Sequence, residues 1–398
     1  MIKRRLLSVL TLVLVITTAV ISVYAASLTY VKKTQFNYFI FDNVGKPTKD
    51  PGEAFWNHYY LNPVIDASNL YGPSIVKNGG VWNVYTGGWR DPGQGNDKIY
   101  LNTTSDPSFR SFNEPKPVLQ VDGGTRYWHA CDPSVVKRSS SLWVMAFTGY
   151  SSYDWIVITS GSDGAHWSPN TFTNRNYEVR FTNKPTGVSN CARPSLNWVP
   201  ENNRWEMYFD ATVDGVSGQY VAYSTETVPR NFTLGPKVGN FVDADVKKVG
   251  DKYIAMYRKD NNFPWKIMWG DSTNGVNFTE RGVLLEPDPL KSYCSQGVTN
   301  PGMAFDDNGT IIAVLFGGTS TTQVNNHKLG VAYPQCKVVP SSGGVAHIYG
   351  QGFSRGQICV DTFQYNTVTN IKVYDKPNYL IVDQNVNSTK GDEWALIR

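Results

Sequence analysis

The sequence predicts an all-β protein, a five-bladed β-propeller followed by a small C-terminal β module. Short β-like runs alternate with turn residues along most of the chain. The composition is rich in Gly (35), Tyr (23) and Trp (12), and long Leu/Ala/Glu stretches at helical spacing are absent. The third observation is a pattern of three β-like runs that recurs five times. It is clearest in residues 132–167, where runs at 132–136, 142–148 and 155–159 precede a turn at Asp163-Gly164 and then Trp167.

The five repeats begin at equivalent positions, at intervals of 60, 61, 50 and 57 residues. These blade-start residues are Gly72, Asp132, Arg193, Asp243 and Asn300. A period of this size with three or four strands per unit is typical of a propeller. One such unit cannot bury both of its faces, whereas radial stacking buries them and removes most exposed strand edges. A β-sandwich is the alternative, but it would not require the same order of elements five times. Residues 66–335 are therefore predicted to form the propeller.

The N-terminus has the form of a secretory signal at residues 1–25. Lys3, Arg4 and Arg5 precede an apolar run at 6–23, and small residues follow near Ala25. The alternative is an uncleaved membrane anchor, because the apolar run approaches spanning length. Cleavage removes three positive charges and lowers the formal net charge from +4 to +1. We therefore expect a secreted, cell-surface or periplasmic protein, monomeric, with no membrane span after cleavage and no nucleic-acid partner.

The segments on either side of the repeats are less regular. Residues 26–65 form a lead-in with one β-like run at 36–41, although a helix is also compatible with it. The aromatic cluster at 55–60 is expected to pack under the repeats. Residues 336–398 do not repeat the pattern and are predicted to form the C-terminal β module. The alternative is that part of this segment, or the run at 36–41, supplies the last strand of the ring.

The five cysteines do not form a CxxC motif, which argues against a thiol redox site or a zinc knuckle. In an exported protein some of them should pair. Cys336 with Cys359 is one candidate pair, and Cys131 with Cys191 is the other. Cys294 is then the free thiol.

Polar and aromatic residues are expected to gather at one mouth of the ring. The first strand of each blade should line the channel, and the second strand should end near the same mouth. Such a ring suits a sugar, because aromatic faces stack on its apolar face and charged groups bind its hydroxyls. Cleavage of a glycosidic bond needs two carboxyl groups. The predicted catalytic residues are Asp132, Asp243 and Asp66. The predicted substrate-binding residues are Trp89, Arg90, Arg193, Asp210, Asp245, Arg258 and Asn300.

Each assignment has a structural alternative. Asp132 before Pro133 is also compatible with plain turn chemistry, and Asp210 and Asp245 with turn-stabilising carboxylates. Trp89 and Trp155 are compatible with packing within a blade. Arg193 is harder to explain structurally, since a guanidinium facing the channel needs an anionic partner or a ligand. No cofactor and no catalytic metal are expected, although an ion in the channel is an alternative for which the scattered His129 and His327 are weak support.

The chain resembles the five-bladed propeller superfamily of glycoside hydrolases, which includes arabinanases, β-xylosidases, invertases and levansucrases. The resemblance covers residues 66–333 and rests on the five repeats and on the starts Gly72-Pro73-Ser74 and Asp132-Pro133-Ser134. Residues 162–167 also look like the Ser-x-Asp-Gly-x-x-Trp hairpin of these and sialidase-like propellers. The resemblance implies an aspartate at the first blade start, where this chain has Gly72, a second aspartate at a later start, and a glutamate acid.

Three functions follow as hypotheses. The first is an exported glycoside hydrolase acting on an oligo- or polysaccharide. The second is a non-catalytic, lectin-like carbohydrate-binding propeller, which Gly72 favours. The third is a structural or protein-binding propeller, for which the mouth carboxylates need not converge. The absence of a P-loop, a dinucleotide fingerprint, HExxH and GxSxG argues against several other enzyme classes.

Overall fold

The computed structural model describes residues 29–32, 48–58, 62–119, 121, 126–289, 291–322, 326–335, 337–340, 345–350, 360–362, 367–375, 380–389 and 393–397. The predicted signal at 1–25, the run at 36–41, Cys336 and Cys359 lie outside these residues. The chain divides into two compact units, one of Met1–Val44 with Gln335–Arg398 and one of Gly45–Pro334. In the described part, no helix is long and apolar enough to cross a membrane.

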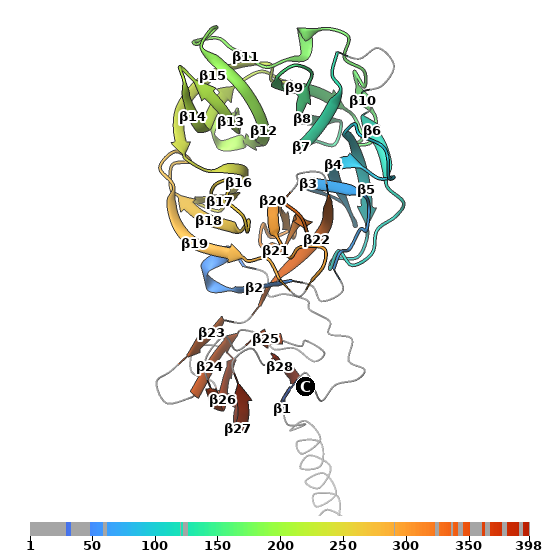
Figure 1. Cartoon of the computed structure of the whole chain (residues 1–398). Helices are drawn as coiled ribbons and strands as arrows, with labels where there is room; N and C mark the ends of the chain where they lie inside the picture. The colour runs from blue at the N-terminus through green and yellow to red at the C-terminus, as the bar shows by residue number, and fades with distance from the viewer. Residues whose placement is uncertain are drawn as a thin grey trace, which may run out of the picture. The chain divides into compact units, whose positions relative to one another are not determined.

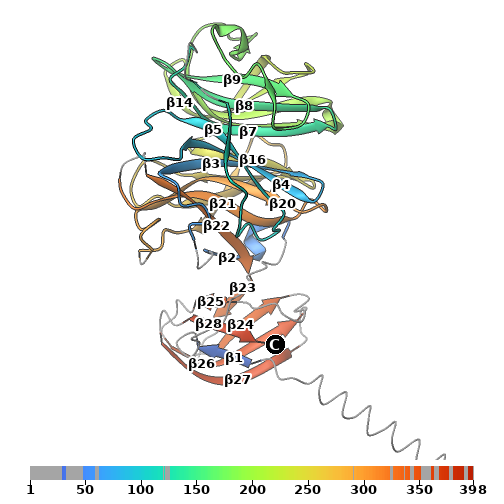
Figure 2. The ribbon, with the colours of Figure 1, turned by 90° about the vertical axis from the view of Figure 1, so that its right-hand side faces the viewer.

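The second unit is a five-bladed β-propeller, which confirms the predicted fold class (Figures 1 and 2). In each blade the first three strands of the repeat follow one another from the channel outward and pair antiparallel. Blades 1 and 2 comprise β3 (Asn69–Asn78), β4 (Val81–Trp89), β5 (Lys98–Thr104), β6 (Lys116–Leu119), β7 (His129–Ser139), β8 (Leu142–Tyr150), β9 (Asp154–Gly161) and β10 (Trp167–Ser168). Blade 3 comprises β12 (Val188–Val199), β13 (Arg204–Val213), β14 (Val216–Ser224) and β15 (Asn231–Gly239), with β11 (Arg180–Phe181) added in parallel to β15. Blades 4 and 5 comprise β16 (Val242–Val249), β17 (Lys252–Arg258), β18 (Ile267–Ser272), β19 (Thr279–Leu285), β20 (Gly297–Phe305), β21 (Ile311–Thr319) and β22 (His327–Gln335).

The ring is closed by a segment that precedes the first blade. The outer strand of blade 5 is β2 (Phe55–His58), next to β22. The alternative that part of residues 336–398 or the run at 36–41 supplies this strand is therefore wrong. This strand contains Trp56, one residue of the aromatic cluster that was expected to pack under the repeats, and Trp56 is buried in the apolar core between blades 4 and 5. Joining the start of the propeller to its last blade removes an open edge from the ring.

The five blade-start residues share one unusual backbone conformation. Their φ angles lie between 46° and 59°, in the left-handed region, for Gly72, Asp132, Arg193, Asp243 and Asn300. At each of them the pairing between the first two strands of the blade shifts register, which is the signature of a β-bulge. A left-handed residue other than Gly costs of order 1–3 kcal/mol, and such strain gathers at functional sites. The sequence repeat is therefore a repeat of one strained backbone position.

Two residues after each blade start, a second repeated position joins neighbouring blades. In four blades its side-chain oxygen accepts a backbone N–H from the next inner strand. The pairs are Ser74 with Val135 (2.9 Å), Ser134 with Leu196 (2.8 Å), Ser195 with Val246 (3.0 Å) and Asp245 with Met303 (2.8 Å). In the fifth blade the position is Gly302, where a Cβ would lie 2.0 Å from the carbonyl oxygen of Pro73. We call this contact between neighbouring blades the seam. In blade 4, Asp245 takes the place that a serine has in blades 1 to 3.

The first unit contains two small sheets. One comprises β1 (Thr29–Lys32), β28 (Glu393–Ile397) and β25 (Val360–Thr362). The other comprises β23 (Lys337–Pro340), β24 (Val345–Gly350), β26 (Thr367–Asp375) and β27 (Leu380–Thr389). Because β1 pairs with β28, the unit takes one strand from the segment that precedes the propeller.

The predicted bond between Cys131 and Cys191 is wrong, since both are buried free thiols. Cys131 directly precedes a blade start, whereas Cys191 lies two residues before Arg193. Alternate residues of a strand point to opposite sides, so this offset of one residue sends the two thiols in different directions. Cys191 lies in the apolar core between blades 2 and 3, and Cys131 lines the cavity described below. Cys294 is also a buried free thiol, as expected.

Candidate functional site

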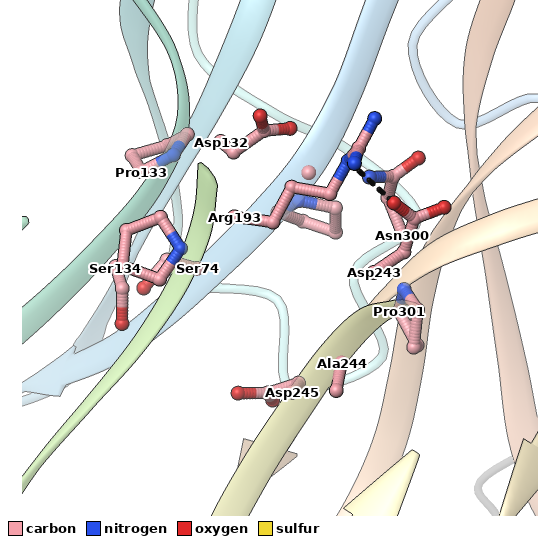
Figure 3. A pocket seen from close by; sticks show the side chains of 13 residues that line it. Ser74, Asp132, Pro133, Ser134, Arg193, Asp243, Ala244, Asp245, Asn300 and Pro301 are labelled. Carbon is pink, nitrogen blue, oxygen red and sulfur yellow. Dashed lines mark ion pairs between the residues drawn. The ribbon is translucent and has the colours of Figure 1, made fainter. Parts of the chain in front are cut away.

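A cavity of about 340 Å³ lies where the inner strands and the ends of the second strands meet. Six residues singled out in the sequence line it: Trp89, Asp132, Arg193, Asp243, Arg258 and Asn300. A narrow channel of about 40 Å³ is lined by all five blade-start residues (Figure 3). The cavity falls within the roughly 300–1,000 Å³ typical of small-molecule pockets.

Asp132 is a carboxyl group held largely out of water at the start of blade 2. The hydroxyl of Thr148 hydrogen-bonds it, and the same hydroxyl oxygen accepts the backbone N–H of Arg193 at 2.8 Å. Burial raises the pKa of Asp132 from 3.8 to about 6. The value of about 6 already includes the guanidinium of Arg193, which opposes the rise, and the charge of Asp243, which adds to it. A carboxyl group in such surroundings can carry a proton near neutral pH.

Asp243 lies in the same cavity but in opposite surroundings. Its carboxylate is 2.5 Å from Arg193 Nε and 2.6 Å from Arg258 Nε, and it accepts the hydroxyl of Thr299 at 2.9 Å. Burial alone would raise the pKa of Asp243, but the two guanidiniums outweigh burial and lower it. Figure 3 shows Arg193 extending toward Asp243. Asp243 is therefore a fixed anion.

Asp210 supports Arg193 from outside the cavity. Its Oδ2 accepts Arg193 Nη1 at 3.1 Å and is 3.5 Å from the backbone nitrogen of Asp243. Burial raises the pKa of Asp210, and Arg193 opposes the rise. Asp210 does not line the cavity, so its direct role is to orient Arg193.

An aromatic wall faces these charges. The guanidinium of Arg258 lies 4.4 Å from the centre of the Trp265 ring. The rings of Trp265 and His327 are nearly parallel, at 4° with centres 6.3 Å apart, and Tyr71 packs against His327 at 5.3 Å. Flat apolar faces beside fixed hydrogen-bonding groups are what a sugar ring requires.

Several polar residues of the cavity were not predicted as site residues, among them Asp97, His129 and Asp154. Asp97 Oδ2 is 2.8 Å from His129 Nδ1, and this hydrogen bond raises the pKa of His129. Asp154, at the start of β9, also lines the cavity, and burial raises its pKa. His129 could have been found, because it lies two residues before Cys131 on the same side of β7. Asp97 directly precedes β5 and Asp154 begins β9, so both lie at the start of the third strand of a blade, a position that the sequence repeat did not identify.

Besides Asp210, three predicted residues do not line this cavity. Asp66 is exposed and pairs with Lys328 at 2.7 Å. Arg90 pairs with Glu114. Figure 3 shows Asp245 pointing away from Arg193 and Asp243. The carboxylate of Asp245 accepts the backbone N–H of Met303 and lies 3.0 Å from Lys247 Nζ. The part of the chain that the structure describes holds no group of three or more His, Cys, Asp or Glu side chains arranged to bind a metal ion.

Comparison with known proteins finds relatives by structure alone. No protein-family model matches the sequence, and no curated protein matches it. The catalytic domain of the GH62 α-L-arabinofuranosidase of Coprinopsis cinerea is similar with a TM-score of 0.50 and 10% identity, covering 72% of this chain and 98% of that one. A thermostable family-43 glycoside hydrolase gives 0.50 and 13%, covering 74% and 97%. An N-acetylgalactosamine deacetylase from F. plautii gives 0.50 and 12%, covering 73% and 95%.

The chain has the propeller fold of these carbohydrate-active enzymes. Identities this low establish the fold and not the activity, which depends on the residues at the mouth.

Proposed function

We propose that the protein is an exported glycoside hydrolase that acts on an oligo- or polysaccharide at the propeller mouth. The observation that carries this proposal is the pair Asp132 and Asp243 in one cavity. Burial raises the pKa of Asp132 to about 6, while Arg193 and Arg258 outweigh burial and lower the pKa of Asp243. Carboxyl groups pushed apart in this way can divide the roles of acid and anion between them.

The reaction assigned to the site is hydrolysis of a glycosidic bond. Neutral Asp132 donates its proton to the glycosidic oxygen as the bond to the anomeric carbon breaks. The anion of Asp243 stabilises the positive charge that develops on the sugar ring. Asp154 accepts a proton from water, whose oxygen bonds to the anomeric carbon. We assign Asp154 because Asp97 is engaged by His129 and because a raised pKa makes a carboxylate a better base.

The test is release of reducing ends from α-1,5-arabino- and β-1,4-xylo-oligosaccharides and from aryl glycosides. Asp132→Asn should reduce the rate by roughly 10²–10⁴-fold, the usual effect of losing a general acid. The parent's rate should fall as pH rises through about 6, since Asp132 then loses its proton. Asp66→Asn is the matched control, because that carboxylate is exposed and lies outside the cavity. Full activity in the Asp132 variant would refute the assignment.

One observation favours the second candidate, a saccharide-binding propeller without catalysis. The first blade start is Gly72, so the position where the resemblance implies an aspartate has no side chain. Binding to a glycan array without release of reducing ends from any bound glycan would favour this candidate. Turnover of any aryl glycoside would exclude it.

A further inference from the structure

A second cavity, of about 260 Å³, adjoins the first at blade 4. The two share Arg258 and Trp265 as lining residues. The second cavity is formed by residues 259–266, which connect β17 to β18. Because β17 ends at Arg258 and Trp265 lies just before β18, this connection begins at the mouth cavity and returns to it.

Hydrogen bonds hold the connection in one shape. Arg258 Nη1 donates to the carbonyl oxygen of Asp260 at 3.0 Å and to Asn261 Oδ1 at 2.7 Å. At the other end, the backbone oxygen of Trp265 accepts Val298 N–H from blade 5 at 3.0 Å. A cavity on a segment fixed at both ends loses little conformational entropy when a ligand binds.

The wall of the second cavity includes a flat aromatic ledge. The half-buried ring of Phe263 stacks on Trp265, with centres 4.1 Å apart and planes 22° from parallel. Trp265 is buried and belongs to both cavities, so the ledge continues the aromatic wall of the mouth. Aromatic faces arranged in sequence suit successive sugar rings of one chain.

The charges around this ledge are of both signs, since Arg258, which pairs with Asp243, and Asp260 line the cavity together with two lysines. Lys259 lies 2.8 Å from Glu280, and Lys266 lies 2.7 Å from Glu286. Both lysines keep exposed side chains at the rim, where their remaining N–H groups can bind hydroxyls. With no excess positive charge, the ledge suits a neutral sugar and not an acidic one.

We infer that this second cavity is a subsite for the neighbouring, uncharged sugar unit of an oligosaccharide whose first unit occupies the mouth. The inference rests on the proposed function and adds its substrate class, a neutral saccharide of at least two units. The chain of the ligand runs past Trp265 and onto Phe263.

The experiment measures binding of α-1,5-arabino- and β-1,4-xylo-oligosaccharides of one to six units, and of a glycan array, to the full chain. The parent should bind two units more tightly than one. Phe263→Leu keeps an apolar side chain but removes the flat face, and it should reduce the gain from the second unit by roughly three- to tenfold. Phe263→Tyr keeps the flat face and should keep the gain.

Trp128→Ala is the control, since Trp128 is an aromatic residue of blade 2 that is 64% exposed and outside both cavities. Loss of the gain in this variant, or its persistence in Phe263→Leu, would overturn the subsite while leaving the proposed function intact. Equal binding of one unit and two by the parent would also overturn it. If the parent neither binds nor cleaves any saccharide, the proposed function fails and the subsite fails with it.

Discussion

Replacing Asp132 by Asn should stabilise the propeller at neutral pH. The folded pKa of Asp132 is about 6 against an ordinary 3.8, so the folded protein holds this proton more tightly than the unfolded chain does. The resulting stability is fully present below pH 3.8 and is lost as pH rises through about 6. The difference corresponds to about 3 kcal/mol as an upper limit, and to about 1–3 kcal/mol for a side chain that water partly reaches. Asn removes the ionisable group and accepts the left-handed backbone, where φ is 48°.

The measurement is urea denaturation followed by the fluorescence of the 12 tryptophans, at pH 4 and pH 7.5. The Asn variant should exceed the parent by about 1–3 kcal/mol at pH 7.5 and by much less at pH 4. Asp66→Asn is the control, because it makes the same Asp-to-Asn change at an exposed carboxylate outside the cavity. The reasoning is refuted if the Asp132 variant is less stable than the parent at pH 7.5. It is refuted as well if the change in free energy is the same at both pH values.

Three further substitutions test the charges and seams of the ring, each by the same denaturation measurement. Arg258→Met leaves buried Asp243 with one guanidinium in place of two and should cost about 3–5 kcal/mol; a loss below about 1 kcal/mol would contradict this. Gly302→Ala places a Cβ 2.0 Å from a backbone oxygen of blade 1 and should cost several times more than Gly80→Ala, where nothing lies within 4 Å. Equal losses for the two glycines would show that the first blade moves aside. Asp245→Ala leaves a backbone N–H of blade 5 without its acceptor and should cost about 1–3 kcal/mol, whereas Asp245→Ser should cost less because three other blades use Ser there. Equal losses for Ala and Ser would indicate that the seam contributes little.

Features that recur in every blade could be predicted from the sequence, whereas features that occur in a single blade could not. The blade starts could be found because each occupies the same bulge, where the choice of residues is narrow. The same logic shows where the prediction for Asp245 failed. Asp245 lies two residues after Asp243, as Ser134 lies two after Asp132, so its counterpart is a seam serine and not a site residue.

The missed residues lie in the connections between strands. Trp265 and Asp97 line the cavity from segments whose length and sequence differ between blades, so no repeated sequence pattern identifies them. Ring closure was missed for a similar reason. The strand Phe55–His58 is too short to show an alternating pattern, and it pairs with β22, more than 250 residues away in the chain. Contacts at such distances follow from the closed shape of the fold and not from local sequence.

Arg193 joins the strained ring to the chemistry of the site. Gly, Asp and Asn tolerate the left-handed backbone, and they occupy the other four blade starts. Arginine has no such preference, so blade 3 is the one blade whose start is not Gly, Asp or Asn. Arg193 nevertheless pairs with Asp243 at 2.5 Å and with Asp210 at 3.1 Å, and its charge opposes the rise in the pKa of Asp132. A residue kept against its backbone preference, at the centre of three buried carboxyl groups, is better explained by control of their charges than by folding alone.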